Sequence, residues 1–267
     1  MFTPEDHTFV VCAYKENPFL SETIESVLAQ TVHSEIIVST STPCDYITSI
    51  CKQHNVLLVV NPLPHYAGDD WNYGYDSADT PLVTIVHQDD IYDPSFLSEV
   101  LAAYNLFSES ETLISFSDYY EIRNGSICRD STLLRIKRLM NAPFKTSFLN
   151  GMGTIKRTVL RFGCPICCPA VTLNKGRLGS SIFDTSLKDS CDYKTWVNLS
   201  FKRGRFVYID KQLVGHRIYS ESATSNNLRE NIRTGETLAI LEMLWPKPIA
   251  RLVNRFYSHS EKLNDVS

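Results

Sequence analysis

The feature that most constrains this chain is a regular alternation of short apolar runs with segments of helical periodicity. Apolar runs occur at Thr8–Tyr14, Glu35–Ser39, Val56–Val60, Leu82–His87 and Thr112–Ser117. Helical segments separate them, at Pro18–Thr31, Asp45–Gln53, Asp69–Ala78 and Pro94–Phe107. Strands that are apolar on both faces and alternate with helices are typical of a parallel sheet covered on both sides. The sequence therefore predicts a doubly wound α/β fold.

The pattern changes after about Asp118. Asn124-Gly125 predicts a hairpin turn, because both residues tolerate positive φ, so a small antiparallel element should follow the parallel sheet. Later segments predict helices at Ser131–Met140, Ser190–Lys202, Asn227–Leu244 and Ile249–Tyr257, and strands at Arg205–Ile209 and Gln212–Arg217. We expect one α/β domain over residues 1–225, in which 1–118 and 119–225 form two functional halves, and a C-terminal helical extension over 226–267.

Charge and composition exclude some classes of protein. The 26 Lys and Arg against 30 Asp and Glu give a net charge of −4, which argues against a protein that binds nucleic acid through its phosphates. The first residues lack the pattern of a secretory signal, and no apolar run approaches the ~20 residues of a membrane span. We therefore expect a cytoplasmic protein whose eight cysteines are free thiols.

The strongest local signal is His87-Gln88-Asp89-Asp90, at the end of the fourth predicted strand. Ligands of open α/β sheets bind outside the carboxyl ends of the strands. Two adjacent carboxylates repel each other there unless a cation compensates them, and a divalent cation that bridges phosphates is a common solution. The pair predicts a metal–diphosphate site, and a simple turn with a helix cap is the alternative. The sequence contains neither the glycine-rich dinucleotide fingerprint nor the phosphate loop that ends in Gly-Lys-Ser/Thr.

The order of several motifs resembles the nucleotide-diphospho-sugar domain of family 2 glycosyltransferases, which have the GT-A fold. The resemblance is carried by Ala13-Tyr14, the Ser21–Thr31 helix with its Ser-Val-Leu-Ala-Gln-Thr run, Glu35–Val38, Asp70–Gly74 and His87–Asp90. Cys191–Trp196 resembles the helix start that supplies the family's acceptor base, and Leu213–Arg217 resembles the arm near the diphosphate. The resemblance as a whole implies a GT-A sheet that is mostly parallel, with a small antiparallel element.

The resemblance also implies roles for individual residues. Asp90 and His216 would bind the metal, Mn²⁺ or Mg²⁺, and Asp192 would be the catalytic base. The residues that would contact the nucleotide-sugar donor are Ala13, Tyr14, Glu16, Asn72, Asp89 and Arg217. Each role has a structural alternative: a helix cap for Asp192, edge packing for His216, a surface ion pair for Arg217 and a core aromatic for Tyr14.

The chain departs from the family pattern in two places. Ser39-Thr40-Ser41-Thr42 stands where the second strand usually ends in an Asp that contacts the base, and His87 replaces the first acidic position of the metal motif. The Cys164–Pro169 segment, with Cys167 and Cys168, looks like half of a zinc site, but no second Cys-x-x-Cys pair occurs. We interpret it as a loop on the acceptor side.

These observations favour a metal-dependent inverting glycosyltransferase. It would move a hexose from a nucleotide diphospho-sugar to a glycan or lipid-linked glycan in surface polysaccharide or glycoconjugate synthesis. A non-catalytic nucleotide-sugar-binding subunit and a sugar-phosphate nucleotidyltransferase are the alternatives. Within Ile249–Tyr257, apolar Ile249, Leu252, Val253 and Phe256 lie beside Arg251 and Arg255, which predicts peripheral contact with the inner face of the cell membrane. Packing of this stripe on the protein's own core, or on a second copy in a homo-oligomer, is the alternative.

Overall fold

The computed structural model describes residues 1–63, 66–108, 111–219 and 232–263, and side chains as far as Ser258. Its strands are β1 (His7–Ala13), β2 (Glu35–Thr40), β3 (Leu57–Val60), β4 (Leu82–His87), β5 (Ile91–Tyr92), β6 (Thr112–Arg123), β7 (Ser126–Cys128), β8 (Val171–Asn174) and β9 (Arg205–Ile218). Its helices are α1 (Leu20–Leu28), α2 (Asp45–His54), α3 (Ala67–Ser77), α4 (Phe96–Asn105), α5 (Thr132–Asn141), α6 (Gly153–Leu160), α7 (Lys175–Leu178), α8 (Cys191–Phe201), α10 (Ile232–Leu241) and α11 (Lys247–Leu263). The predicted α/β alternation is confirmed.

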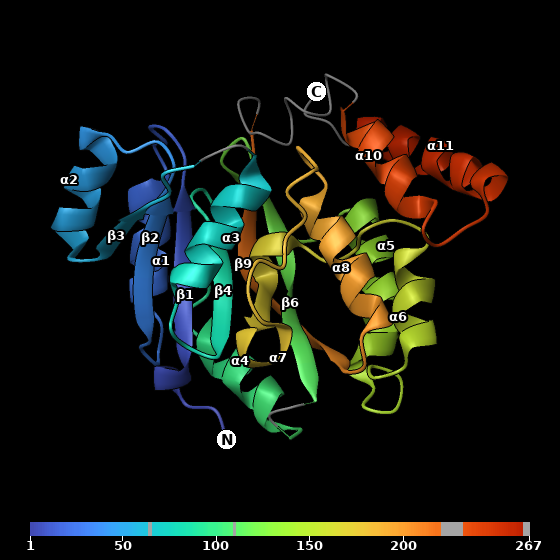
Figure 1. The fold of residues 1–267 in the computed structure, drawn as a ribbon, viewed down its shortest axis with the longest axis horizontal. Helices are drawn as coiled ribbons and strands as arrows, with labels where there is room; N and C mark the ends of the chain where they lie inside the picture. The colour runs from blue at the N-terminus through green and yellow to red at the C-terminus, as the bar shows by residue number, and fades with distance from the viewer. Residues whose placement is uncertain (64–65, 109–110, 220–231, 264–267) are drawn as a thin grey trace.

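One sheet runs through the molecule in the order β3-β2-β1-β4-β8-β6-β9-β5, and β7 pairs with β6 (Figure 1). β1 is parallel to both β2 and β4, and β6 is parallel to β9. The short β8 lies antiparallel between β4 and β6, and β5 lies antiparallel at the edge beside β9. The mostly parallel sheet with antiparallel elements that the sequence predicts is therefore confirmed.

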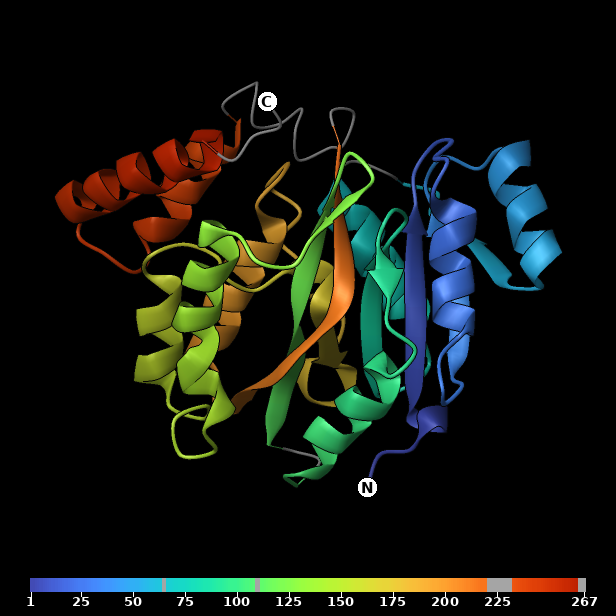
Figure 2. The same cartoon turned by 180° about the vertical axis from the view of Figure 1, so that it is seen from behind.

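Helices cover both faces of the sheet. α1, α2 and α4 share a core with one face, which is turned toward the viewer in Figure 2. α3 and α8 pack on the other face, with α6 and α10 outside them. Alternating residues of β1 supply the two cores, since Phe9 and Val11 belong to one hydrophobic cluster and Val10 to the other. β1 is thus buried on both sides, as its continuous apolar run predicts.

The later part of the chain differs in detail from the prediction. The two strands expected at Arg205–Ile209 and Gln212–Arg217 form one strand, β9, because its register on β6 passes from Ile209 to Gln212 and leaves Asp210-Lys211 as a bulge. The hairpin at Asn124-Gly125 forms with φ of 46° and 80°. The helices α6 and α7 and the strand β8 were not predicted, because segments this short show too little periodicity.

The C-terminal helices α10 and α11 pack against each other and lie at the end of the molecule toward which β1 and β4 run (Figure 1). α10 covers part of the predicted Asn227–Leu244 helix, whose first residues, 227–231, lie outside the described residues. The border predicted at residues 225/226 also lies outside them. Ile240 of α10 and Ala250 of α11 belong to the same hydrophobic cluster as Val10, so the extension shares the core of the domain.

Close packing of α3 on the sheet leads to a first prediction. A Cβ added at Gly74 would lie 2.6 Å from Val10 Cγ1 and 3.0 Å from the Cβ of Ser39. We expect Gly74→Ala to lower the free energy of unfolding by about 1–3 kcal/mol, since both neighbours are held in strands. Gly235→Ala in α10 is the control, because nothing lies within 4 Å of its added Cβ, and it should not destabilise the protein. Urea denaturation of both variants measures the difference, and equal midpoints would contradict the prediction.

Candidate active site

Polar contacts tie together the carboxyl ends of three neighbouring strands. The backbone amide of Tyr14, after β1, donates to Gln88 Oε1 at 2.8 Å, and Gln88 Nε2 donates back to the Tyr14 carbonyl at 3.1 Å. Lys15 adopts a left-handed conformation with φ of 56°, and its amide donates to Thr42 Oγ1 at 2.6 Å. The loops after β1, β2 and β4 are therefore fixed relative to one another. Tyr14 and Glu16 are exposed on this edge, and Ala13 is buried beneath it.

Asp90 is the central acidic residue of this edge, and its side chain is fully buried. Its Oδ1 accepts hydrogen bonds from His216 Nδ1 at 3.0 Å and from the backbone amide of Arg217 at 2.9 Å. Its Oδ2 has no hydrogen-bond partner among the described residues and lies 3.8 Å from His87 Nδ1. A buried carboxylate oxygen without a donor is costly, so a ligand that supplies positive charge fits this position.

The charges of this cluster are unequal. Burial opposes ionisation of Asp90, but His216 and the Arg217 amide outweigh it and hold the pKa of Asp90 below its usual value. For His216, the attraction of Asp90 outweighs burial and raises its pKa. Burial, followed by the negative charge of Asp90, raises the pKa of Asp89. Asp90 is therefore the carboxylate that stays ionised.

Asp89 and Arg217 make several polar contacts within the protein, among them the ion pair that the sequence offered as the alternative role of Arg217. The Asp89 carboxylate accepts a hydrogen bond from Tyr219 at 2.9 Å, and Arg217 Nε donates to the Asp89 carbonyl at 2.8 Å. The Arg217 guanidinium also pairs with Glu22 of α1 at 2.8 Å and lies 3.9 Å from the centre of the Phe19 ring. The side chain of Arg217 thus clamps the acidic turn to α1, and its contact with a donor phosphate stays a prediction.

His87 occupies the other side of Asp90. Its ring stacks on Trp71 of α3, with centroids 5.0 Å apart and an angle of 21° between the planes. Burial lowers the pKa of His87 more than Asp90 and Asp89 raise it, so the ring tends to be neutral. The aromatic partner was not predicted, because stacking of Trp71 on a strand-end histidine depends on how α3 crosses the sheet.

Asn72 and Asp70 of α3 are held by protein contacts. Asn72 is buried, and both ends of its amide bond the backbone of Phe183, at 2.8 and 2.9 Å. Asp70 accepts hydrogen bonds from Ser41 at 2.6 Å and Asn61 at 2.9 Å, beside the end of β2. A carboxylate therefore lies near the position where the sequence has Ser41 in place of the usual Asp. A donor contact by Asn72 stays a prediction.

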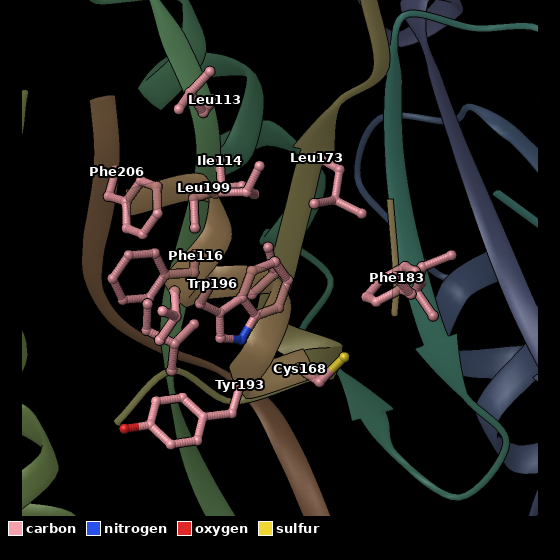
Figure 3. Packing of buried hydrophobic residues seen from close by; sticks show 14 of the residues in the cluster. Leu113, Ile114, Phe116, Cys168, Leu173, Phe183, Tyr193, Trp196, Leu199 and Phe206 are labelled. Atoms are coloured by element: carbon pink, nitrogen blue, oxygen red, sulfur yellow. The ribbon is translucent and has the colours of Figure 1, made fainter. Parts of the chain in front are cut away.

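Asp192 lies in the first turn of α8, which is anchored by the hydrophobic core. Trp196 of the same helix is fully buried in the cluster of Figure 3, together with Phe116 and Phe183. Tyr193 turns its hydroxyl away from Trp196 and donates to the Leu160 carbonyl at 2.5 Å. Burial raises the pKa of Asp192 to about 6, although Arg233 and the Tyr193 backbone lower it. Asp192 is thus half-ionised near pH 6 and mostly ionised at neutral pH.

The Cys164–Pro169 loop connects the two acidic positions. Burial raises the pKa of the Cys167 thiol, and both Asp90 and Asp192 raise it further, so this loop lies close to both carboxylates. All of its cysteines are free, and their raised pKa values keep them as neutral thiols. Asp90, which follows β4, and Asp192, in the first turn of α8, therefore both lie within electrostatic reach of the buried Cys167 thiol. That they form one site stays a prediction.

Lys137 of α5 was missed by the sequence analysis. Its ammonium donates to the hydroxyl of Tyr119 at 2.8 Å, and it lies near enough to Asp192 and Cys167 to lower the pKa of both. Its sequence neighbours Arg135 and Arg138 are also basic, so the sequence gave no sign that Lys137 alone turns toward the site.

The side chains around Asp90 supply only some of the ligands that a divalent metal ion needs. Across residues 1–63, 66–108, 111–219 and 232–263, no three His, Cys, Asp or Glu side chains form a group that could hold a metal ion by themselves. The unpartnered Oδ2 of Asp90 and the His216 ring offer two ligands, and a bound diphosphate could complete the set. Within these described residues, Cys164, Cys167 and Cys168 form no such group either.

Comparison with known proteins identifies the class. Residues 8–140 match the family model described as glycosyl transferase family 2. The chain belongs to this family, and it is therefore a glycosyltransferase. No curated protein sequence matches the chain.

Solved structures share the fold at low sequence identity. Residues 1–349 of S. aureus TarS superpose with a TM-score of 0.62 at 16% identity, over 93% of this chain and 69% of that one. A mannosyltransferase from Pyrobaculum calidifontis gives 0.63 at 12% identity, over 99% and 79%. Glucosyl-3-phosphoglycerate synthase from Mycobacterium tuberculosis gives 0.60 at 15%, over 89% and 79%. The GT-A fold predicted from the sequence is confirmed.

Proposed function

We propose that this protein is a metal-dependent, inverting glycosyltransferase that moves a hexose from a nucleotide diphospho-sugar to a hydroxyl of a glycan or lipid-linked glycan. The observation that carries the proposal is the buried Asp90 carboxylate. Its Oδ1 bonds His216, and its Oδ2, which lies 3.8 Å from His87 Nδ1, has no hydrogen-bond partner among the described residues. Asp90 and Asp192 both raise the pKa of the Cys167 thiol. Of the two carboxylates, Asp90 can bind a cationic ligand and Asp192 can accept a proton.

Known ligands of the structural neighbours support the class of donor. TarS has a structure in complex with UDP-GlcNAc, and the mannosyltransferase has one with GDP-Man and Mn²⁺. The synthase was solved with Mn²⁺ and UDP-glucose. Family membership favours transfer over the two alternatives, a non-catalytic subunit and a nucleotidyltransferase.

Asp90 and His216 are the proposed holders of Mn²⁺ or Mg²⁺. His216 uses Nδ1 to bond Asp90, which leaves Nε2 as the ring nitrogen available to a ligand. A bound divalent cation would neutralise charge that develops on the departing diphosphate. The chain's own contribution is to hold the Asp90 carboxylate ionised and fixed, through His216 and the Arg217 amide. We also propose that six residues contact the nucleotide-sugar donor: Ala13, Tyr14, Glu16, Asn72, Asp89 and Arg217. Tyr14 is exposed, and its backbone amide bonds Gln88.

Asp90→Asn tests the metal-binding role. The amide keeps an oxygen for His216 and Arg217 but removes the negative charge. We expect Mn²⁺-dependent binding of the donor nucleotide to weaken by at least about tenfold, the lower range for damage to a metal site. Calorimetric titration with UDP and GDP, with and without Mn²⁺, measures this. Asp79→Asn, in an exposed loop position, is the matched control. Unchanged Mn²⁺-dependent affinity in Asp90→Asn would rule out this role.

Asp192 is the proposed general base that takes the proton of the acceptor hydroxyl. The groups around it that carry or could carry charge are Arg233, Asp189, Lys137 and the thiols of Cys164, Cys168 and Cys191. Burial dominates them and places the pKa at about 6, near the working pH that general-base catalysis favours.

The predicted pH dependence follows from this value. A base must be deprotonated to act, so kcat should fall as the pH drops below about 6 and should level off above it. Asp192→Asn should lower kcat by about 10²–10⁴-fold and remove this acidic limb, while donor affinity stays unchanged. Asp189→Asn, on the neighbouring loop, is the comparison, and it should keep the limb. Wild-type turnover in Asp192→Asn would place the base elsewhere.

Contact with an anionic membrane is proposed for α11. Ala250 is buried and Val253 packs toward the core, but Ile249, Leu252 and Phe256 remain 42, 56 and 69% exposed. Only part of the predicted apolar stripe is therefore used by the protein's own core. Arg251 and Arg255 are exposed beside it, and each basic residue near an anionic surface adds about 1 kcal/mol of attraction. None of the helices in the described part of the chain is long and apolar enough to cross a membrane. We propose peripheral attachment at the inner face of the cell membrane, in a cytoplasmic protein.

Vesicle flotation tests this attachment. The wild type should float with anionic vesicles at low salt, and the double variant Leu252→Ser with Phe256→Ser should float at least about tenfold less, because it loses inserted apolar surface. Leu106→Ser is the control, since this leucine is 72% exposed directly after α4. Equal flotation of wild type and double variant, or none by either, would contradict membrane contact. Concentration-dependent dimers that the double variant abolishes would instead assign the face to a homo-oligomer.

A further inference from the structure

Lys137 differs from the other basic residues of α5. Arg135 pairs with Asp130 at 2.5 Å, and Arg138 pairs with Asp118 at 2.7 Å. Within the part of the chain that the structure describes, Lys137 has no carboxylate partner, and its ammonium donates a hydrogen bond to the neutral hydroxyl of Tyr119. Its side chain is half-buried, so water does not fully replace a partner. An anionic ligand would add to the stabilisation of a half-buried cation in such a place.

The surroundings of Lys137 keep its charge. Burial alone lowers its pKa, but Tyr119, Tyr257 and Cys167 outweigh burial and raise the pKa above the usual value for lysine. The ammonium therefore carries a proton throughout the pH range in which Asp192 titrates. Its remaining N–H donors can be used by a ligand.

Lys137 lies near both His216 and Asp192. Tyr119 stands between it and His216, since the ring packs edge-on against His216 with centroids 6.2 Å apart and its hydroxyl accepts from Lys137. The charge of Lys137 acts on Asp192 and on Cys167 of the connecting loop. Lys137 thus has Tyr119, Cys167 and Tyr257 of α11 among its neighbours, and Asp192 within reach of its charge.

We propose that Lys137 recognises an anionic group, a phosphate or a carboxylate, on the acceptor substrate. The inference rests on the proposed function, because it takes the space beside Asp192 as the acceptor position. The ammonium of Lys137 pairs with the anionic oxygens and so orients an acceptor hydroxyl toward Asp192. The acceptor is accordingly an acidic sugar or a sugar phosphate, free or lipid-linked, and a neutral glycan binds more weakly. Departing diphosphate is the competing source of anionic oxygens, and the experiment separates the two.

The test measures anion binding while the nucleotide position is filled. The full chain is saturated with Mn²⁺ and UDP or GDP, whichever binds, and inorganic phosphate is titrated calorimetrically. Lys137→Gln should weaken phosphate binding by about tenfold or more, the usual loss of a charged hydrogen bond. Lys137→Arg should keep it. Arg135→Gln removes a charge from the exposed side of the same helix and should leave phosphate binding unchanged. Parallel titrations use glucose 1-phosphate, glucuronate and methyl glucoside. The two anionic sugars should bind more tightly than the neutral one to the wild type and to Lys137→Arg, but not to Lys137→Gln.

Each other outcome counts against the inference. Equal phosphate binding by wild type and Lys137→Gln, or none by the wild type, overturns it. A loss of UDP or GDP affinity in Lys137→Gln, with phosphate binding intact, assigns Lys137 to the donor diphosphate and also overturns it. If neither nucleotide binds the wild type, the proposed function fails on its own. The phosphate titration of the free chain then still decides whether residue 137 binds an anion.

Discussion

The site depends on the burial of one ionised carboxylate. Asp90 is fully buried, and two hydrogen bonds to its Oδ1, from His216 and the Arg217 amide, compensate its charge. Loss of either partner leaves buried charge uncompensated, which costs several kcal/mol in proteins. Asp90 directly precedes β5, which pairs with β9, so these bonds extend the β5–β9 contact to the acidic turn after β4. The needs of the buried Asp90 carboxylate therefore help to fix this turn against β9.

The two acidic positions differ because their surroundings differ. Asp90 has a cationic partner and an amide donor, so its pKa falls, whereas Asp192 is buried near neutral thiols and its pKa rises to about 6. Environments that separate the pKa values of two carboxylates allow one to bind charge and the other to exchange protons. The buried Cys167 thiol lies within electrostatic reach of both carboxylates.

The helical parts of the chain surround the position of Asp192. Trp196 and Tyr193 fix α8 in the core, α5 brings Lys137 to Tyr119, and α11 brings Tyr257 close to Lys137. None of these elements belongs to the strand-and-helix alternation of the first half. The parallel half of the fold thus supplies the hydrogen-bonded loops near Asp90, and the later helices supply charged groups near Asp192.

The sequence alone determined the α/β alternation, the Asp89-Asp90 turn at the end of β4 and the acidic start of α8, because each depends on local periodicity or on residues next to one another. Only the tertiary structure decided that Asp90 meets His216, 126 residues later, and that Arg217 turns toward Glu22. It also placed Asn72 against Phe183 and singled out Lys137 among three basic neighbours. These contacts depend on which strands β9 pairs with and on where α3 and α5 pack. No local pattern in a single sequence encodes such long-range contacts.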